Sequence, residues 1–379
     1  MAKRIPFKRL EPWQDPKVKP LIQIENISKS YNGILAVNNL NLLIYKHEFF
    51  SILGGSGCGK TTILRLISGF EKPTSGRIYI DGTDITDRPP YERPVNMMFQ
   101  SYALFPHMTV QENIAFGLKQ SHLPKGEMNH RLDKVLELLQ LKDYAKRLPD
   151  QLSGGQKQRT ALARSLVKQP KVLLLDEPLA ALDKKLREKT QFELVNIQES
   201  LGVTFVMVTH DQEEAMTMST RISVMEEGRI RQVGTPTEVY EFPNSVFVAD
   251  FIGSINIFEG FVMEDEPDHV VVKSGEIESE LYVGHSASAP IGSHVHIAIR
   301  PEKIFISLDD PEKERNCTKG IVKEIGYLGD VSIYHVRLES GKIVLATIQN
   351  QFRQAEHAVA WDDEVYLYWN SDGCLLLTY

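Results

Sequence analysis

Two patterns of apolar residues divide the chain, and the change from one to the other falls near Tyr240. Before it, short uninterrupted apolar runs alternate with stretches at helical spacing, an order typical of a parallel sheet covered by helices. After it, helical spacing is scarce, and short alternating strands recur between Gly, Asp and Ser turns. The clearest predicted strands are 48–53, 172–175 and 203–208 in the first part, and 295–299, 331–338 and 364–368 in the second.

This change predicts at least two domains in a chain of 379 residues. We expect a flexible N-terminal extension over 1–20, an α/β domain over 21–244 and an all-β barrel over 245–379. Within the α/β domain, residues from about 101 to 166 have the pattern of a helical subdomain.

Composition narrows the function classes. The net charge of −7 argues against a nucleic-acid partner. Three scattered cysteines without CxxC spacing predict neither a disulfide framework nor a zinc site, and they fit a reducing cytosol. We expect no transmembrane helix, because no apolar run approaches about eighteen residues. We expect no signal peptide, because no apolar segment follows the basic N-terminus.

The strongest motif is Gly54-Gly55-Ser56-Gly57-Cys58-Gly59-Lys60-Thr61, which matches the P-loop pattern G-x-x-x-x-G-K-[ST]. It lies between a predicted buried strand and a predicted helix that begins with Thr62, which is the context of a phosphate-binding loop. Glycines let successive N–H groups turn inward, and the helix adds the positive end of its dipole. Lys60 is placed to reach the β- and γ-phosphates and Thr61 to ligate Mg²⁺. ATP and Mg²⁺ are therefore the expected ligands.

Two carboxylates follow a predicted central strand. Asp176 and Glu177 come directly after 172–175, at the carboxyl edge where α/β sheets bind ligands. Asp176 is suited to hold Mg²⁺ through water, and Glu177 to accept a proton from attacking water. Either residue alone could instead be a helix cap, but the P-loop favours the functional interpretation.

Three further features have structural alternatives. The turn Leu152-Ser153-Gly154-Gly155-Gln156 leads into a helix, whose free N–H groups either bind an anion or are capped by Ser153. His210 either contacts a γ-phosphate or caps a helix. Tyr31 either stacks on an adenine ring or is an ordinary aromatic residue at the end of a strand.

Together these motifs resemble the nucleotide-binding subunits of ABC transporters, over about residues 21–242. The resemblance implies an ABC ATPase, an α/β P-loop NTPase with a helical subdomain. It makes 152–156 the signature sequence, Gln100 the Q-loop glutamine that contacts Mg²⁺, and Tyr31 the adenine-stacking residue. It also assigns Glu177 as the catalytic glutamate, His210 as the switch histidine and Leu182-Asp183 as the D-loop.

Two departures from the family pattern are small. Ala180 stands where serine is frequent, and Gly55 stands where proline or alanine is common. The C-terminal part, with Arg300-Pro301-Glu302 and Tyr327-Leu328-Gly329-Asp330, resembles the OB-like, TOBE-like regulatory barrel of importer ATPases.

The resemblance also implies partners. A second copy would bind head to tail, so that Ser153, Gly154, Gly155 and Gln156 act in trans. Two integral-membrane permease subunits would hold the protein at the cytoplasmic face of the membrane, with an extracytoplasmic substrate-binding protein as an indirect partner. We expect Gln100–Met108 to meet a permease helix through exposed Tyr102, Phe105 and Met108, unless these side chains only pack the helical subdomain.

The cargo is the least constrained inference. Segments 97–100 and 113–120 and the N-terminal extension are most similar to ATPases of polyamine importers, which makes putrescine or spermidine the hypothesis. Ferric iron, sugars, sulfate and phosphonates stay open. The alternative from another class is a soluble ABC ATPase that acts on DNA or ribosomes. Paired ATPase halves, coiled-coil insertions or basic patches would favour that alternative. A non-catalytic regulator would lack the carboxylate of Glu177.

Overall fold

The computed structural model describes residues 11–120, 123–180, 182–284, 288–311, 315–350 and 359–378. The chain forms two compact units, Met1–Thr237 and Glu238–Tyr379. This division falls a few residues before the predicted domain boundary at 244. None of the described helices is both long enough and apolar enough to cross a membrane.

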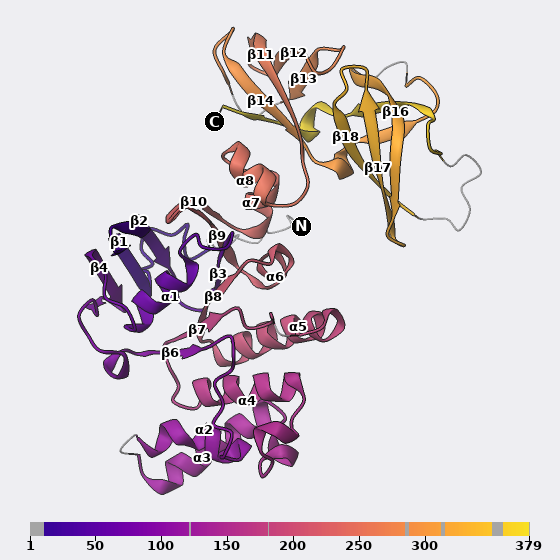
Figure 1. The fold of residues 1–379 in the computed structure, drawn as a ribbon. Coiled ribbons are helices and arrows are strands. Elements are labelled where there is room, and N and C mark those ends of the chain that lie inside the picture. The colour runs from indigo at the N-terminus through magenta and orange to yellow at the C-terminus, as the bar shows by residue number, and fades with distance from the viewer. Residues whose placement is uncertain are drawn as a thin grey trace, which may run out of the picture. The chain divides into compact units, whose positions relative to one another are not determined.

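A six-stranded sheet forms the centre of the first unit (Figure 1). Its order is β10-β9-β3-β8-β7-β6, and every neighbouring pair is parallel except β10 with β9. Its strands are β3 (Phe49–Gly54), β6 (Val95–Met98), β7 (Val172–Asp176), β8 (Thr204–Thr209), β9 (Arg221–Glu226) and β10 (Arg229–Gly234). A second, antiparallel sheet has the order β2-β1-β4-β5, with β1 (Ile22–Tyr31), β2 (Ile34–Ile44), β4 (Ser75–Ile80) and β5 (Thr83–Asp84).

The parallel strands are apolar throughout because both of their faces are covered. Phe50 and Ile52 of β3 belong to a core cluster with α1 (Lys60–Ser68) and the antiparallel sheet. Phe49 belongs to a second cluster, on the side of the helices. This double burial holds the ends of the parallel strands in place, and the site described below lies at their carboxyl ends.

Most helices of the first unit lie on the second cluster. They are α2 (Val110–Lys119), α3 (Lys125–Leu138), α4 (Gly154–Leu166) and α5 (Lys184–Leu201), followed by the short α6 (Gln212–Met218). Between β6 and β7 the described residues contain helices and turns but no strand. Figure 1 shows α2, α3 and α4 together at one end of this unit. Thr109 begins α2 with a capping box, in which its side chain and that of Glu112 bond to each other's backbone.

Part of the predicted N-terminal extension packs on the first unit. The Arg221 guanidinium lies 4.9 Å from the ring centroid of Trp13. The same guanidinium forms a buried ion pair with Glu48, with Nε 2.6 Å from Oε1. Residues 1–10 of the extension lie outside the described residues.

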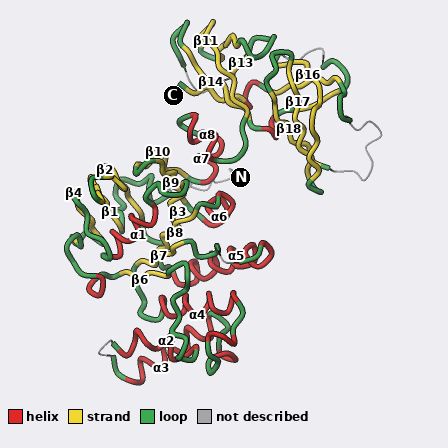
Figure 2. The backbone as a smooth tube through the Cα atoms, viewed as in Figure 1, coloured by secondary structure: helices red, strands yellow, loops and turns green. Residues whose placement is uncertain are grey.

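The second unit consists mainly of strands (Figure 2). One antiparallel sheet has the order β13-β12-β11-β14-β20, with β11 (Asn256–Glu266), β12 (His269–Ser274), β13 (Leu281–Gly284), β14 (His294–Ile299) and β20 (Cys374–Leu377). The other has the order β15-β19-β16-β17-β18, with β15 (Phe305–Ser307), β16 (Asn316–Tyr327), β17 (Val331–Leu338), β18 (Ile343–Gln349) and β19 (Glu364–Trp369). One buried cluster takes side chains from both sheets, including Phe258 stacked on Trp369.

Two short helices precede these sheets: α7 (Pro236–Glu241) and α8 (Val246–Phe251). Arg300 connects them to the strands, because its guanidinium donates to the carbonyl oxygens of Tyr240 and Ala249.

Candidate functional site

The predicted site residues come from neighbouring parallel strands. β3 leads into the P-loop, β7 ends at Asp176, and β8 ends one residue before His210. Because β8 pairs in parallel with both β3 and β7, these three carboxyl ends meet at one edge of the sheet. A pocket of about 470 Å³ lies there, lined by Ala36, Ser56, Gly57, Gly59, Lys60, Thr61, Thr62, Glu177 and His210.

The P-loop backbone leaves no room for larger side chains at two glycines. Gly59 is the N-cap of α1 with φ of 106°, and a Cβ there would lie 2.3 Å from the carbonyl oxygen of Ala36. A Cβ at Gly54 would lie 2.5 Å from the carbonyl oxygen of Met225. The loop therefore curls tightly before the free N–H groups of α1, which is the geometry that receives a phosphate.

Lys60 lies inside this curl, with only 6% of its surface exposed. Its Nζ donates to the carbonyl oxygens of Gly54 and Gly55, both at 2.8 Å. The ammonium is therefore held by the loop whose phosphate ligand it is expected to contact.

Thr61 and Asp176 form a pair of oxygen ligands. The Thr61 hydroxyl donates to Oδ1 of Asp176 at 3.3 Å. Burial raises the pKa of the Asp176 carboxyl, the hydrogen bond from Thr61 opposes that shift, and the charge of Glu177 adds to it. A hydroxyl next to a carboxylate at the end of a phosphate-binding loop matches the oxygen preference of Mg²⁺.

The carboxylate of Glu177 is held by two side chains from other elements. Gln100 donates from Nε2 to Oε2 at 3.0 Å, and Nδ1 of His210 lies 3.1 Å from Oε1. Glu177 itself has a left-handed backbone with φ of 44°, and its N–H donates to the carbonyl oxygen of Val208. Such backbone strain in a non-glycine residue is typical of functional sites, where the surrounding structure enforces it.

The loop that carries His210 is anchored from its far side. Asp211 caps α6 and accepts a hydrogen bond from Nη1 of Arg187 at 3.0 Å. Arg187 also donates to the carbonyl oxygen of Leu182, in the predicted D-loop. The sequence contains no local signal for this connection, because Arg187 lies in an ordinary charged helix.

Several predicted site residues do not line the pocket. Gly54, Gly55, Cys58, Gln100 and Asp176 belong to the elements around it, whereas the signature sequence and Tyr31 lie apart from its lining. Ser153 does cap α4, since its Oγ accepts from the N–H of Gln156 and the Gln156 side chain accepts from the N–H of Ser153, but residues 153–156 do not line the pocket. Tyr31 does not line it either; it ends β1, with Nζ of Lys29 4.8 Å from its ring centroid.

One prediction about the surface is wrong. Tyr102 is only 8% exposed and belongs to the core cluster on the helical side, so it does not form a docking surface. Its backbone is left-handed, with φ of 60°, and nothing in the local sequence predicts that turn.

Comparison with known proteins shows which family has this arrangement of residues. The model for the ABC transporter family matches residues 37–180, and the model for the TOBE domain matches 297–377. The chain is 54% identical over 359 residues to the putrescine transport ATP-binding protein PotG of Escherichia coli (strain K12), covering 95% of each.

The chain belongs to the ABC transporter family.

Other relatives agree. The spermidine/putrescine import ATP-binding protein PotA of Protochlamydia amoebophila is 45% identical, with 94% of this chain and 96% of that protein covered. The solved structure of cbiO1 from Clostridium perfringens matches 58% of this chain and 90% of its own, at 33% identity and a TM-score of 0.55. The dimeric structure of the bacterial ABC transporter cassette MJ0796 matches 57% of this chain and 98% of its own, at 35% identity and a TM-score of 0.51. The predicted fold class, an ABC ATPase followed by an all-β OB-like domain, is confirmed.

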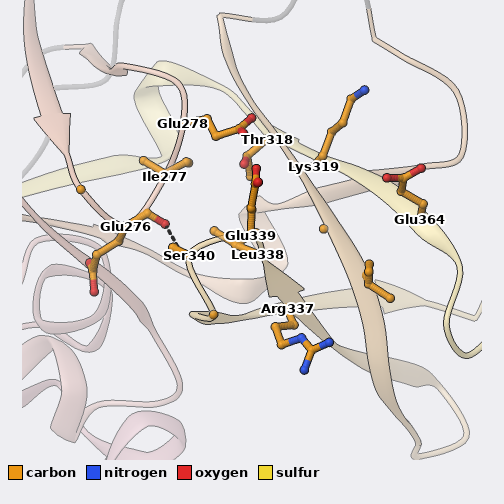
Figure 3. Close-up of a pocket in the computed structure, with 14 residues that line it drawn as sticks. Glu276, Ile277, Glu278, Thr318, Lys319, Arg337, Leu338, Glu339, Ser340 and Glu364 are labelled. Atoms are coloured by element: carbon orange, nitrogen blue, oxygen red, sulfur yellow. Dashed lines mark hydrogen bonds between the residues drawn. The ribbon is translucent and has the colours of Figure 1, made fainter.

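The C-terminal unit of this ABC protein has a larger hollow of about 800 Å³ (Figure 3). One rim is tied by the Ser340 hydroxyl, which donates to the carbonyl oxygen of Glu276 at 2.7 Å. Glu278 shares a hydrogen bond with Glu339, which together with the charge of that neighbour raises the pKa of Glu278. The charged lining residues are Glu276, Glu278, Glu339, Glu364, Lys319 and Arg337. With four carboxylates against two cations, this hollow is less suited to a phosphate than the P-loop pocket.

Proposed function

We propose that this chain is the ATP-hydrolysing subunit of a membrane importer, and that the importer carries polyamines such as putrescine or spermidine. The 54% identity to a putrescine transport ATP-binding protein over 95% of both chains carries the proposal for the cargo. The P-loop pocket, with Glu177 and His210 on its wall, supports hydrolysis.

ATP would bind with its phosphates in the curl of residues 54–62. The phosphate oxygens would accept hydrogen bonds from the backbone N–H groups of Gly57 to Thr61, at the start of α1. Lys60 would exchange its bonds to the carbonyl oxygens of Gly54 and Gly55 for bonds to the β- and γ-phosphates. Tyr31 remains the proposed adenine contact from the end of β1.

Thr61 and Asp176 would hold Mg²⁺, with Gln100 reaching it from the end of β6. Among the described residues there is no cluster of three or more His, Cys, Asp or Glu side chains able to hold a metal alone. That agrees with Mg²⁺, which proteins hold through one or two side chains and the substrate's phosphates. When bound, the ion would neutralise charge on the phosphates.

Glu177 would orient the attacking water and accept its proton. Its two present partners suit this role, because Gln100 and His210 fix the carboxylate from opposite oxygens. His210 would also help hold the γ-phosphate in line.

A second copy would complete the site. Residues 153–156 do not line the pocket of their own chain, and a head-to-tail partner would bring its Ser153 to the γ-phosphate. The dimeric state of the similar cassette MJ0796 supports this arrangement.

Two permease subunits would bind beside Gln100 and keep the protein at the cytoplasmic face of the membrane, with a substrate-binding protein acting from outside. Phe70 and Phe99 are 54% and 37% exposed, and their ring centroids lie 5.8 Å apart. With the partly exposed Phe105 and Met108 they would form the docking face, a surface rich in apolar side chains that would meet a permease helix.

The test is uptake of radiolabelled putrescine, beside spermidine, ferric iron and maltose, in cells lacking this gene. The cells are complemented with the wild-type gene or with Glu177→Gln. We expect loss of polyamine uptake that only the wild type restores. Normal putrescine uptake with loss of another cargo would overturn the polyamine assignment, and no change for any cargo would favour a soluble ABC ATPase.

A further inference from the structure

Arg164 links the helix that begins at the signature sequence to the segment after Gln100. It lies near the C-terminal end of α4, whose N-cap is Ser153. Its Nη1 donates to the carbonyl oxygen of Ala103 and its Nη2 to that of Tyr102, both at 2.8 Å. The guanidinium also faces the ring of Phe105, 5.4 Å from its centroid.

The charge of Arg164 has no carboxylate partner. None of the ion pairs among the described residues includes Arg164. Burial lowers the pKa of its guanidinium. A guanidinium stays charged in proteins, and among the described residues two carbonyl oxygens and an aromatic face compensate this charge. A partly buried cation held only by one short segment is expected to constrain that segment strongly.

The backbone that Arg164 binds is strained. Tyr102 and Ala103 have φ values of 60° and 44°, in the left-handed region that residues with a Cβ rarely adopt. Two successive left-handed residues are energetically costly and persist only where neighbours enforce them. The two hydrogen bonds from Arg164 end on the carbonyl groups of these two residues.

The other end of the segment is held by Asn113 of α2, which is fully buried. Its Oδ1 accepts from the N–H of Phe105 at 2.8 Å, and its Nδ2 donates to the carbonyl oxygens of Phe105 and Met108. The segment is thus fixed by α4 at its start and by α2 at its end. Gln100, two residues before Tyr102, contacts Glu177.

We propose that Arg164 is a positioning residue that locks the turn at Tyr102–Ala103 onto α4, so that Gln100 and the docking face move together with Ser153. This inference rests on the proposed function for what the docking face meets. The locking itself is independent of the cargo and of any permease. Arg164 would therefore be needed for permease-stimulated hydrolysis and much less for ATP binding by the isolated subunit.

The first arm of the test uses the purified full-length chain. Hydrogen–deuterium exchange is measured for peptides covering residues 99–108 in the wild type, Arg164→Gln and Arg164→Lys. Arg159→Gln is the matched control, because Arg159 lies on the same helix beside a different hollow, with Leu138 and Glu193. Loss of two charge-assisted hydrogen bonds should speed exchange in this segment by about tenfold or more in Arg164→Gln.

The second arm uses the complete importer reconstituted in vesicles. The KM for ATP of the isolated subunit should change less than about twofold in Arg164→Gln, whereas hydrolysis stimulated by the cargo-loaded binding protein should fall at least about tenfold, and by more than the basal kcat does. Arg164→Lys should recover only part of it, since an ammonium cannot donate in the same fork.

Unchanged exchange at 99–108 in Arg164→Gln would overturn the proposed lock. Faster exchange with full cargo stimulation would overturn its role in coupling, and an equal loss of basal and stimulated hydrolysis would reduce Arg164 to a stabilising residue. If the wild-type complex takes up no putrescine, the proposed cargo fails, and the exchange data still decide whether Arg164 locks the segment.

Discussion

Nδ1 of His210 lies 3.1 Å from Oε1 of Glu177, and each residue directly follows one of two neighbouring parallel strands. The pair gives a general base a fixed orientation before any substrate is bound. Because Gln100 holds the other carboxylate oxygen at 3.0 Å, small changes at Glu177 should affect turnover far more than binding.

Glu177→Gln should lower ATP turnover by about 10²-fold or more, because the amide cannot accept the proton of the attacking water. ATP binding should persist, and the dimer should become easier to isolate with ATP. Steady-state hydrolysis, nucleotide binding and size-exclusion chromatography test the three points. The exposed Glu188→Gln is the control, and normal hydrolysis by Glu177→Gln would exclude Glu177 as the base.

Lys60→Ala should weaken ATP binding itself. The variant removes a buried ammonium that is expected to bond to two phosphates. Each charge-assisted hydrogen bond of this kind contributes about 1.5–3 kcal/mol, which corresponds to roughly ten- to a hundredfold in affinity. Equilibrium binding of a fluorescent ATP analogue measures the effect. Lys72→Ala, on a side chain that is 75% exposed, should leave the affinity unchanged.

Ser153→Arg should separate binding from hydrolysis. If Ser153 serves the partner's nucleotide, the variant blocks hydrolysis in the dimer by about 10²-fold, the effect expected for losing a donor to a developing charge. ATP affinity of the dilute monomer should stay within about twofold. An equal loss of affinity in the monomer would argue against action in trans.

The buried ion pair of Arg221 and Glu48 should contribute to stability more than the surface pairs do. Arg221→Met leaves the Glu48 carboxylate buried and unpaired, which should cost about 3–5 kcal/mol. Trp13→Ala, which removes the ring against Arg221, should cost about 0.5–2 kcal/mol. Urea unfolding followed by far-UV circular dichroism measures both losses. Breaking the surface pair of Lys189 and Glu193 should cost under about 1 kcal/mol.

Tyr240 should destabilise the second unit at high pH. Burial, followed by the hydrogen bond to Glu302 at 2.7 Å, raises the pKa of Tyr240 to about 12. Since the unfolded chain releases this proton near pH 10, the folded state loses stability as the pH rises from about 10 to about 12. Tyrosinate absorbance should reveal one late-titrating phenol that disappears in Tyr240→Phe. Glu302→Gln should shift that titration to lower pH.

The site could be predicted where its chemistry is contiguous in the sequence. The P-loop and Asp176-Glu177 each follow an apolar strand directly, so spacing alone places them at the same sheet edge. The partners of Glu177 required knowledge of the sheet order, because Gln100 and His210 are distant in the chain.

The segment after Gln100 could not be predicted correctly, for a physical reason. Its apolar residues with little charge suggest a surface that docks a helix. In the structure the chain makes a left-handed turn at Tyr102 and Ala103, and the tyrosine is buried. The carbonyl groups of that turn accept hydrogen bonds from Arg164, a residue whose helix shows only ordinary periodicity. Side chains that bond to distant backbone carbonyls leave no pattern in a single sequence.

The position of β3 in the sequence affects how the protein folds during its synthesis. All six of its residues are buried, and both of its sheet neighbours, β8 and β9, are encoded far downstream. A ribosome therefore exposes an apolar strand with both edges open until Thr209 has emerged, and with one edge open until Glu226 has emerged. Premature termination between the P-loop and β9 would release fragments that carry the nucleotide motif but aggregate, so synthesis of this subunit should depend on chaperones that shield nascent strands.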